Sequence, residues 1–429
     1  MGHMKKHTIS YASFFMAMIL YLSGCSAAAV TGRRSMEPVA VLDYVVPTGL
    51  PSVMTDLTGY SRCSEKYAYL RFSEEAGKTD FFRIRNMDLD RIVYEGAFEP
   101  AKGNDLLLKA DFSDIEMAGR YRLECDIYGC SEEFTISDGK YESQAAEMSV
   151  LVREECRDLS ASPETVLDFL QAYEWYGANA GGDDENGSII SDAPDELLAV
   201  RDWISGKDKS DSDPGDAVVY AAILAKFSFL YKDYDSALAT ECLQKASSIF
   251  SQSTGALRSD PDYFRALTEL YRASGESVYY ESLSNYKDYF SSNDAFLNDG
   301  YMYGAMTYIV TRQVVDKELC DMLVNAILSK AQSINSRKRE ITDPMYSQTD
   351  GPSEMTDYLR TLMCANYILK GYEYDRTIQL MMHFLSGLNV ESSVFDPGPS
   401  NSGIYCLAYS HLAQLEAEGK LYGENGEIK

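Results

Sequence analysis

The spacing of apolar residues changes once along this chain, close to residue 138, and this change limits the possible folds more than any other feature. Ahead of it, Tyr121, Leu123, Cys125 and Ile127 alternate with polar residues, a period that indicates a strand with one buried face. From Tyr141 onward, apolar residues recur at intervals of three and four, as they do on one face of a helix. We therefore expect a β domain followed by an α-helical domain.

The strand pattern extends over residues 48–138. Short runs of alternating apolar and polar residues occur at 67–72, 81–85 and 91–94. Turn residues separate these runs, which predicts a β-sandwich. Tyr128-Gly129 is expected to form a hairpin turn. The cysteines on either side of it, Cys125 and Cys130, are compatible with a disulfide and equally with two separate thiols.

The helical pattern extends over residues 139–425. Twelve helices are expected, at 141–157, 163–176, 193–205, 215–231, 234–251, 260–274, 276–290, 296–313, 316–334, 352–371, 373–388 and 403–418. Several have suitable starts, such as Ser162 followed by Pro163 in the first turn. Twelve helices with short connections suit six antiparallel pairs.

The first 25 residues have the layout of a secretory signal. Basic residues precede a mostly apolar run at 9–22, which is too short to span a bilayer. The segment Leu22-Ser23-Gly24-Cys25 resembles a bacterial lipobox, in which the cysteine is lipidated and becomes the new N-terminus. We expect a lipid anchor at Cys25, a tether over residues 26–47, and a position on the extracellular face of a bacterial membrane. A plain signal peptide is the alternative.

The composition narrows the possible partners. A formal net charge of −27 argues against nucleic acid, because an acidic surface repels phosphate and releases no counterions from it. The cysteines form no CxxC pair and the chain has only four histidines, so no zinc site is expected. The acidic segment 177–191 lacks the EF-hand pattern and is interpreted as a solvated loop. No metal and no cofactor are expected.

Several segments carry a family resemblance. In the β domain they are Asp56 to Tyr60, Lys66 to Ala68, Arg91 to Gly96, Asp111 to Ser113 and Gly119 to Leu123. In the helical part they are Ala193 to Trp203, Glu269 to Glu276 and Met382 to Asn389. Together they resemble family 9 glycoside hydrolases, the cellulase family, over about residues 48–420. The resemblance implies an N-terminal immunoglobulin-like β-sandwich packed on an (α/α)6 toroid.

The catalytic motifs of that family are missing. An inverting glycosidase needs two carboxyl groups about 6.5–9.5 Å apart, one as general acid and one as general base. The family places its base in an Asp-Ala-Gly-Asp motif after the first helix, where this chain has only residues 158–164. Asp213 to Asp216 is similar by its letters but lies at a helix start. Val390 to Ser402 lacks the His-His-Arg segment, and Asn401-Ser402 stands in place of the Asn-Glu that supplies the acid.

Other carboxylates are weaker candidates. Asp350 and Asp396 are the pair that we nominate as relocated catalytic groups, although both suit turns and helix caps. Tyr346 and Trp175 could stack on a sugar ring, and Glu354 lies beside the same loop as Asp350. Trp203, in the middle of a predicted helix, is expected in the core.

These observations lead to one main hypothesis. The chain is expected to be a surface lipoprotein of cellulase-like architecture that binds a glycan, such as a β-glucan, without cleaving it. One alternative is an active inverting glycosidase with relocated carboxylates, and the other is a scaffold that binds a protein partner.

Overall fold

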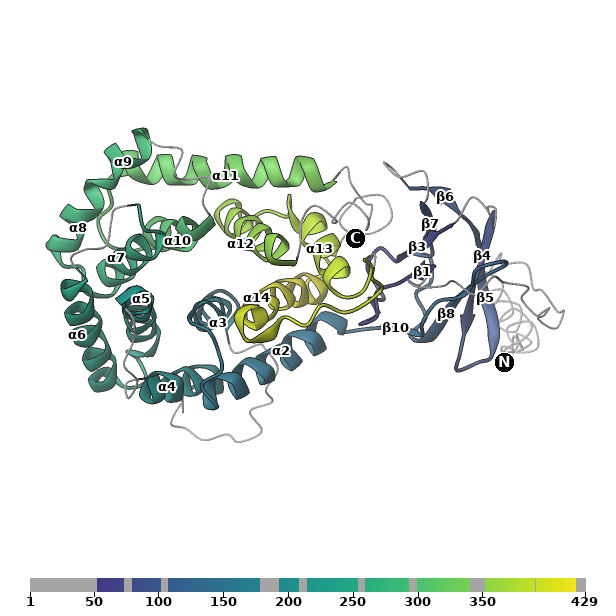
Figure 1. Cartoon of the computed structure of the whole chain (residues 1–429), viewed down its shortest axis with the longest axis horizontal. Helices are drawn as coiled ribbons and strands as arrows, with labels where there is room; N and C mark the ends of the chain where they lie inside the picture. Colours follow the sequence, from purple (N-terminus) through teal and green to yellow (C-terminus); the bar gives the residue numbers. More distant parts are fainter. Residues whose placement is uncertain are drawn as a thin grey trace, which may run out of the picture.

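The structure is a computed structural model of the chain, with a β domain at one end and a helical domain at the other (Figure 1). It describes residues 52–72, 79–101, 107–177, 193–207, 214–253, 259–292, 299–339, 352–389 and 391–421. The predicted signal segment, Cys25 and the tether lie outside these residues. No helix in the described part of the chain is long and apolar enough to cross a membrane.

Two sheets make up the β domain, and they confirm the predicted immunoglobulin-like sandwich. The strands are β1 Val53–Met54, β2 Tyr60–Ser61, β3 Tyr67–Arg71, β4 Phe81–Asn86, β5 Arg91–Ala97, β6 Glu99–Pro100, β7 Leu107–Asp111, β8 Gly119–Cys125, β9 Gly129–Cys130 and β10 Phe134–Ser137. One sheet has the order β1-β3-β7-β6, and the other has the order β2-β10-β8-β4-β5 with β9 also paired to β8. Alternate residues of these strands fill the space between the sheets. The Tyr60 ring, for example, meets the rings of Phe112 and Phe134 edge-on, with centroids 5.3 and 5.4 Å away.

The expected hairpin is present, but its turn is shifted. The chain reverses at Asp126–Tyr128, and Gly129 already belongs to β9. Cys125 pairs with Gly129 across the hairpin, while Cys130 is opposite Glu124. Because side chains alternate between the faces of a sheet, the two thiols point to opposite sides. Both cysteines are free, which agrees with the interpretation as separate thiols.

The helical domain is a ring of helices inside a second layer (Figure 1). The inner helices are α3 Pro163–Tyr176, α5 Pro214–Tyr231, α7 Pro261–Ser274, α10 Met302–Val310, α12 Pro352–Leu369 and α14 Gly398–Ala417. The outer helices are α2 Lys140–Arg157, α4 Asp195–Lys207, α6 Ser236–Gln252, α8 Ser277–Ser284, α9 Tyr286–Ser292, α11 Lys317–Arg339 and α13 Asp375–Leu385. Each inner helix contacts the next, and α14 contacts α3, which closes the ring. A short 3-10 helix, η3 Asp299–Tyr301, precedes α10.

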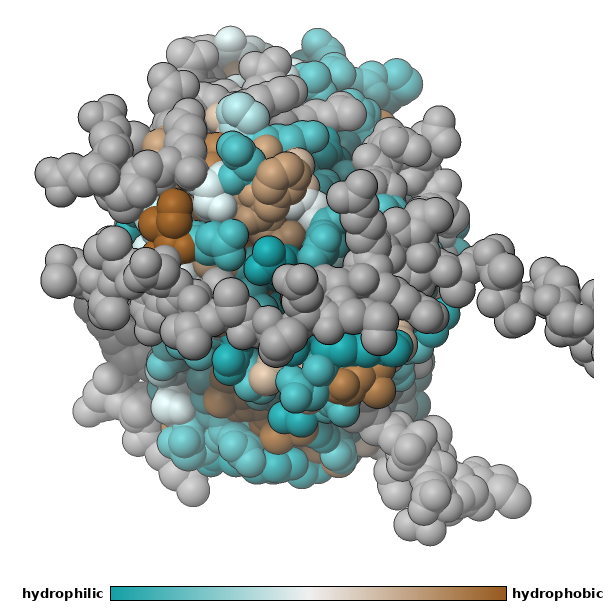
Figure 2. Space-filling view, turned by 90° about the vertical axis from the view of Figure 1, so that its right-hand side faces the viewer, coloured by the Kyte–Doolittle hydropathy of each residue, from teal (hydrophilic) through white to brown (hydrophobic). Residues whose placement is uncertain are grey.

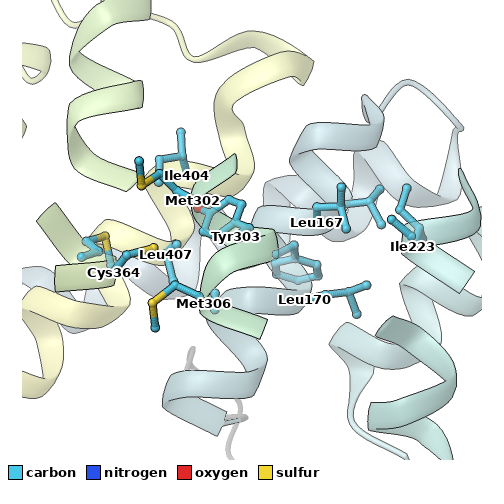
Figure 3. Packing of buried hydrophobic residues seen from close by; sticks show 14 of the residues in the cluster. Leu167, Leu170, Ile223, Met302, Tyr303, Met306, Cys364, Ile404 and Leu407 are labelled. Carbon is cyan, nitrogen blue, oxygen red and sulfur yellow. The ribbon is translucent and has the colours of Figure 1, made fainter. Parts of the chain in front are cut away.

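The interior of the ring is filled by side chains. Figure 3 shows this packing for residues of α3, α5, α10, α12 and α14, among them Leu170, Ile223 and Leu407. In α5, the residues from Ala221 to Ala225 are all buried, because an inner helix is covered by neighbours on every side. Trp203 of α4 is 1% exposed and donates Nε1–H to the carbonyl of Ala161, which confirms its place in the core.

Most helices differ by a few residues from the expected boundaries, and two of these differences have a clear local cause. The predicted helix at 276–290 is interrupted at Asn285, whose side-chain amide binds the carbonyl of Glu281 and so competes with the helical pattern. The last helix, α14, begins at Gly398 rather than at residue 403. Pro399 suits its first turn, and the Asp396 carboxylate accepts the N–H of Gly398 at 2.9 Å.

Buried charges connect the two domains. The Asp56 carboxylate of the sandwich lies 3.1 Å from Lys140 Nζ and 2.5 Å from His383 Nδ1. Burial alone raises the pKa of Asp56, but the Lys140 ammonium and the His383 hydrogen bond outweigh it, so that pKa is lowered. Burial lowers the pKa of His383 despite its bond to Asp56, so a neutral imidazole donates Nδ1–H to the carboxylate. Leu388 adds an apolar contact by packing with Tyr67 and Tyr69.

The surface of the β domain that faces away from the helices is mostly hydrophilic. Figure 2 shows this face, with small hydrophobic groups between polar ones and grey atoms over part of it. Phe81 of β4 is an exposed large apolar side chain in this domain, at 67%. Isolated exposures of this kind are common on soluble surfaces and indicate no interface by themselves.

Candidate functional site

The two ends of the helical ring differ in the segments that form them. Because inner and outer helices alternate along the chain, every connection that enters an inner helix lies at one end, which we call the entry end. Residues 158–162, before α3, and 391–397, before α14, are two described segments of this kind. They correspond to the segments in which the resemblance places a general base and a general acid, so the entry end is where such chemistry is expected.

At the entry end, the segment before α3 packs directly on α14. The backbone N–H of Ser162 and the hydroxyl of Thr165 both donate to the carbonyl of Pro399, at 3.0 and 2.7 Å. A Cβ added to Gly403 would lie 2.3 Å from the carbonyl oxygen of Thr165, so the two helix starts are in close contact. The connection before α3 is therefore short and lies directly against the start of α14.

Ser402, in the position where the resemblance expects the acid, lies inside α14 rather than before it. Its hydroxyl donates to the carboxylate of Glu155, which comes from the C-terminal turn of α2. Burial raises the pKa of Glu155, the Ser402 bond opposes this, and the carboxylates of Asp158 and Asp396 raise it further. By contrast, hydrogen bonds from Ser160 lower the pKa of Asp158. Environments that shift the pKa values of two neighbouring carboxyl groups in opposite directions are typical of acid and base pairs.

The carboxylate of Asp357, on α12, has a structural partner. Asp357 accepts from Arg360 Nη1 at 2.8 Å, and Arg360 also binds the buried Asp168 of α3 at 2.8 Å. Coulombic attraction to Asp168 outweighs the effect of burial and raises the pKa of Arg360. Glu354 and Asp396 are both exposed, and the Asp396 carboxylate binds the start of α14.

The structure separates the predicted site residues. Asp350 and Tyr346 lie outside the described residues, so the nominated Asp350–Asp396 pair stays a prediction. Glu354 and Asp396 are at the entry end. Trp175 is at the opposite end, where its ring stacks on Tyr367 of α12 with centroids 4.5 Å apart and planes inclined by 16°.

The opposite end of the ring, where α3, α5, α7 and α10 terminate, contains a pocket of about 500 Å³. It is lined by Tyr173, Glu174, Gly177, Phe229, Leu230, Lys232, Asp233, Tyr234, Arg272, Val310, Thr311 and Arg312. We call it the exit pocket, because it lies where the inner helices leave the ring.

Two charged residues of the lining, Glu174 and Arg272, belong to a buried cluster that also contains Lys226 and Glu269 behind the pocket wall. Arg272 bridges Glu174 at 2.5 Å and Glu269 at 2.6 Å, and Lys226 bridges the same two carboxylates at 2.5 and 3.6 Å. Burial alone raises the pKa of Glu174, but Lys226 and Arg272 outweigh it and lower that pKa to about 2. Thr307 donates a further hydrogen bond to Glu269 at 2.7 Å.

Comparisons with known proteins agree with this architecture. Residues 50–129 match the cellulase N-terminal ig-like domain. The structure matches that of a metagenome-derived glycoside hydrolase family 9 endoglucanase over 80% of this chain and 84% of that one, with a TM-score of 0.63 and 17% identity. It has the fold of the family 9 glycoside hydrolases.

Two further solved structures show the family 9 fold in the same way. A Bacteroides ovatus family 9 protein is matched over 99% of its chain and 86% of this one, with a TM-score of 0.62 and 13% identity. AaCel9A, solved with a cellobiose-like isofagomine, is matched over 84% of its chain and 80% of this one, with a TM-score of 0.62 and 14% identity. No curated protein matches the sequence. The family 9 fold is therefore present here on a very different sequence.

Sequence reasoning missed the two groups of charged residues that this family 9 fold brings together. Glu155 lies within the helix expected at 141–157, and Glu269 and Arg272 lie within the segment Glu269 to Glu276 of the resemblance, so neither group is marked by a motif. One pattern could have found the second group. Glu269 and Arg272 are spaced by one turn on a helix whose other positions, such as Leu267 and Leu270, are also buried.

Proposed function

We propose that this chain is a carbohydrate-binding lipoprotein on the outer face of a bacterial membrane, with the architecture of a family 9 endoglucanase and without its hydrolytic chemistry. The observation that supports this most is the direct contact of the short connection before α3 with the start of α14, together with a serine where the resemblance expects the acid. A serine hydroxyl is not a general acid near neutral pH. The relation to AaCel9A, solved with a cellobiose-like compound, supports a β-glucan as the ligand.

A direct test compares binding with turnover. The mature protein is incubated with soluble β-glucans, and released reducing ends are measured beside binding in an affinity gel. We expect retarded migration without release of reducing ends. Reducing ends released by the wild-type protein would contradict the loss of hydrolysis, and the absence of binding to every glycan would favour a protein scaffold instead. A separate experiment tests the lipid anchor. We expect processing of the chain to be sensitive to globomycin, and Cys25→Ala to lose its attachment to the membrane.

One observation favours a second candidate, an active glycosidase with relocated carboxylates. The raised pKa of Glu155 beside Asp158 and Asp396 is the electrostatic arrangement of a general acid with nearby bases. If this candidate is correct, Glu155→Gln lowers turnover by about 100-fold or more. Glu154→Gln, an exposed neighbour on the same helix, is the matched control and should retain full turnover.

A further inference from the structure

The exit pocket lies at the other end of the ring from the entry connections, and it combines a buried base with an exposed rim. Glu174 and Arg272 at its base are largely buried, with 15% and 3% of their side-chain surface exposed. Lys232, Asp233 and Arg312 on its rim are exposed. Buried charges beneath a concave surface are typical of sites that recognise polar ligands.

The charges at the base are balanced. Two carboxylates, Glu174 and Glu269, face two cations, Lys226 and Arg272, through contacts of 2.5 to 3.6 Å. Replacing such a group by apolar residues is often neutral or stabilising, so stability alone does not account for it. A balanced base offers no net charge to an ionic ligand, which favours a neutral one.

The pocket presents both donors and acceptors. Lys232 and Arg312 add donors on the rim, and Asp233 adds an acceptor. The C-terminal ends of four inner helices also direct carbonyl groups and a partial negative charge toward this end. Hydroxyl groups, which donate and accept at once, match this mixture better than a simple anion or cation.

Aromatic side chains complete the lining. The hydroxyls of Tyr173 and Tyr234 lie 3.1 Å apart at the pocket, and both residues are partly accessible. At the same end of the ring, Trp175 stacks on Tyr367. Aromatic rings beside polar groups suit sugars, because the C–H face of a sugar packs on an aromatic face while its hydroxyls bind polar groups. The volume of about 500 Å³ is in the usual range for small-ligand pockets.

We propose that the exit pocket binds a neutral mono- or disaccharide, in a site separate from the entry end. The proposal does not depend on the proposed function, because the two sites lie at opposite ends of the ring. It also gives a role to the charged base, which the entry-end packing does not use.

Isothermal titration with glucose, mannose, galactose, N-acetylglucosamine and cellobiose tests the proposal. We expect at least one of these sugars to bind with a Kd of about 1 mM or tighter. The double variant Asp233→Asn/Arg312→Gln should weaken this binding by about tenfold, because it removes one acceptor and one set of donors from the rim. Both residues are exposed, so the fold should be unchanged, as a thermal melt will check.

The controls separate this site from the entry end. The double variant Glu354→Gln/Asp396→Asn should leave binding of the small sugar unchanged, and the rim variant should leave β-glucan retardation unchanged. The proposal is overturned if none of the five sugars binds, if the entry-end variant and not the rim variant removes binding, or if citrate binds at the rim while sugars do not. Failure of β-glucan binding with retained small-sugar binding would remove the proposed function alone.

Discussion

The pKa values of two carboxyl groups, the buried Glu155 and the partly buried Glu174, are displaced in opposite directions. Burial dominates at Glu155, whose hydrogen-bond donor is the neutral hydroxyl of Ser402. At Glu174 two cations, Lys226 and Arg272, outweigh burial. The difference follows from the neighbours alone, since desolvation disfavours the charged form of any carboxyl group and nearby cations favour it.

The lowered pKa of Glu174 predicts a pH-dependent stability. Its folded-state pKa of about 2 lies below the ordinary value of 4.5, so its carboxylate stabilises the fold above pH 4.5 and loses that effect as the pH falls toward 2. We expect Glu174→Gln to be destabilised at neutral pH, and the gap in unfolding free energy to shrink as the pH is lowered below 4.5. Urea unfolding of both proteins at several pH values, from neutral to about pH 3, measures this difference in unfolding free energy. A gap that stays constant over this range would contradict the assignment, and Glu154→Gln should show no gap.

At the scale of helices, Gly403 allows α3 and α14 to pack closely, because it has no side chain at their contact. A Cβ on Gly403 would also lie 2.9 Å from Thr165 Cα and 2.9 Å from Asp168 Cβ. The glycine was expected to mark the start of the last helix, yet it lies five residues inside α14. Its function is close helix packing, which outweighs the lower helix propensity of glycine.

Gly403→Ala should therefore destabilise the protein. The added methyl group meets backbone atoms of α3, which cannot move aside without separating the helices, and we expect a loss of about 1–3 kcal/mol. Chemical denaturation gives the value. Gly371→Ala is the matched control, because its Cβ would meet only ordinary contacts at 3.8 Å or more and should change stability little. Equal effects of the two substitutions would show that the contact between α3 and α14 is less close than described.

At the scale of the whole molecule, the sandwich and the helical ring share a polar interface. Glu416 of α14 accepts from the hydroxyl of Ser61 in the sandwich and also from the backbone N–H of Tyr141 at the start of α2, at 3.0 Å. Arg376 of α13 binds Glu65 at 3.3 Å. Together with the buried Asp56 cluster, these contacts fix the sandwich on the side of the ring formed by α2, α13 and α14, so the two domains should unfold together.

Asp56→Ala tests this coupling. The substitution leaves Lys140, which is 4% exposed, without its carboxylate in a buried place, and we expect a loss of about 3–5 kcal/mol. Differential scanning calorimetry should show one transition in the wild type and two in the variant. As a control, Arg62→Ala removes a pair with Asp138 whose side chains are 45% and 66% exposed, and it should cost about 0–1 kcal/mol. A single unshifted transition in Asp56→Ala would mean that the apolar contacts alone join the domains.

The kinds of elements and their order could be predicted from the sequence because they depend on local patterns. Alternation gave the strands, intervals of three and four gave the helices, and the start of α3 at Pro163 follows from its Ser162 cap, whose side chain accepts from the N–H of Thr165. The errors arose where a tertiary contact outweighed a local preference. Gly403 inside α14 is the clearest case, whereas the interruption at Asn285 comes from a local side-chain bond to the carbonyl of Glu281.

Side chains that are far apart in the sequence become neighbours only because the ring closes. Ser402 reaches Glu155 across 247 positions of sequence, and Arg272 reaches Glu174 across 98. Trp175 was predicted as a sugar-stacking residue from its neighbours in sequence, and only the direction of α3 placed it at the exit end. The sequence by itself determined a sandwich followed by a domain of successive helices, because periodicity is local. The tertiary structure decided which charges share a pocket, because helices far apart in sequence become neighbours only when the ring closes.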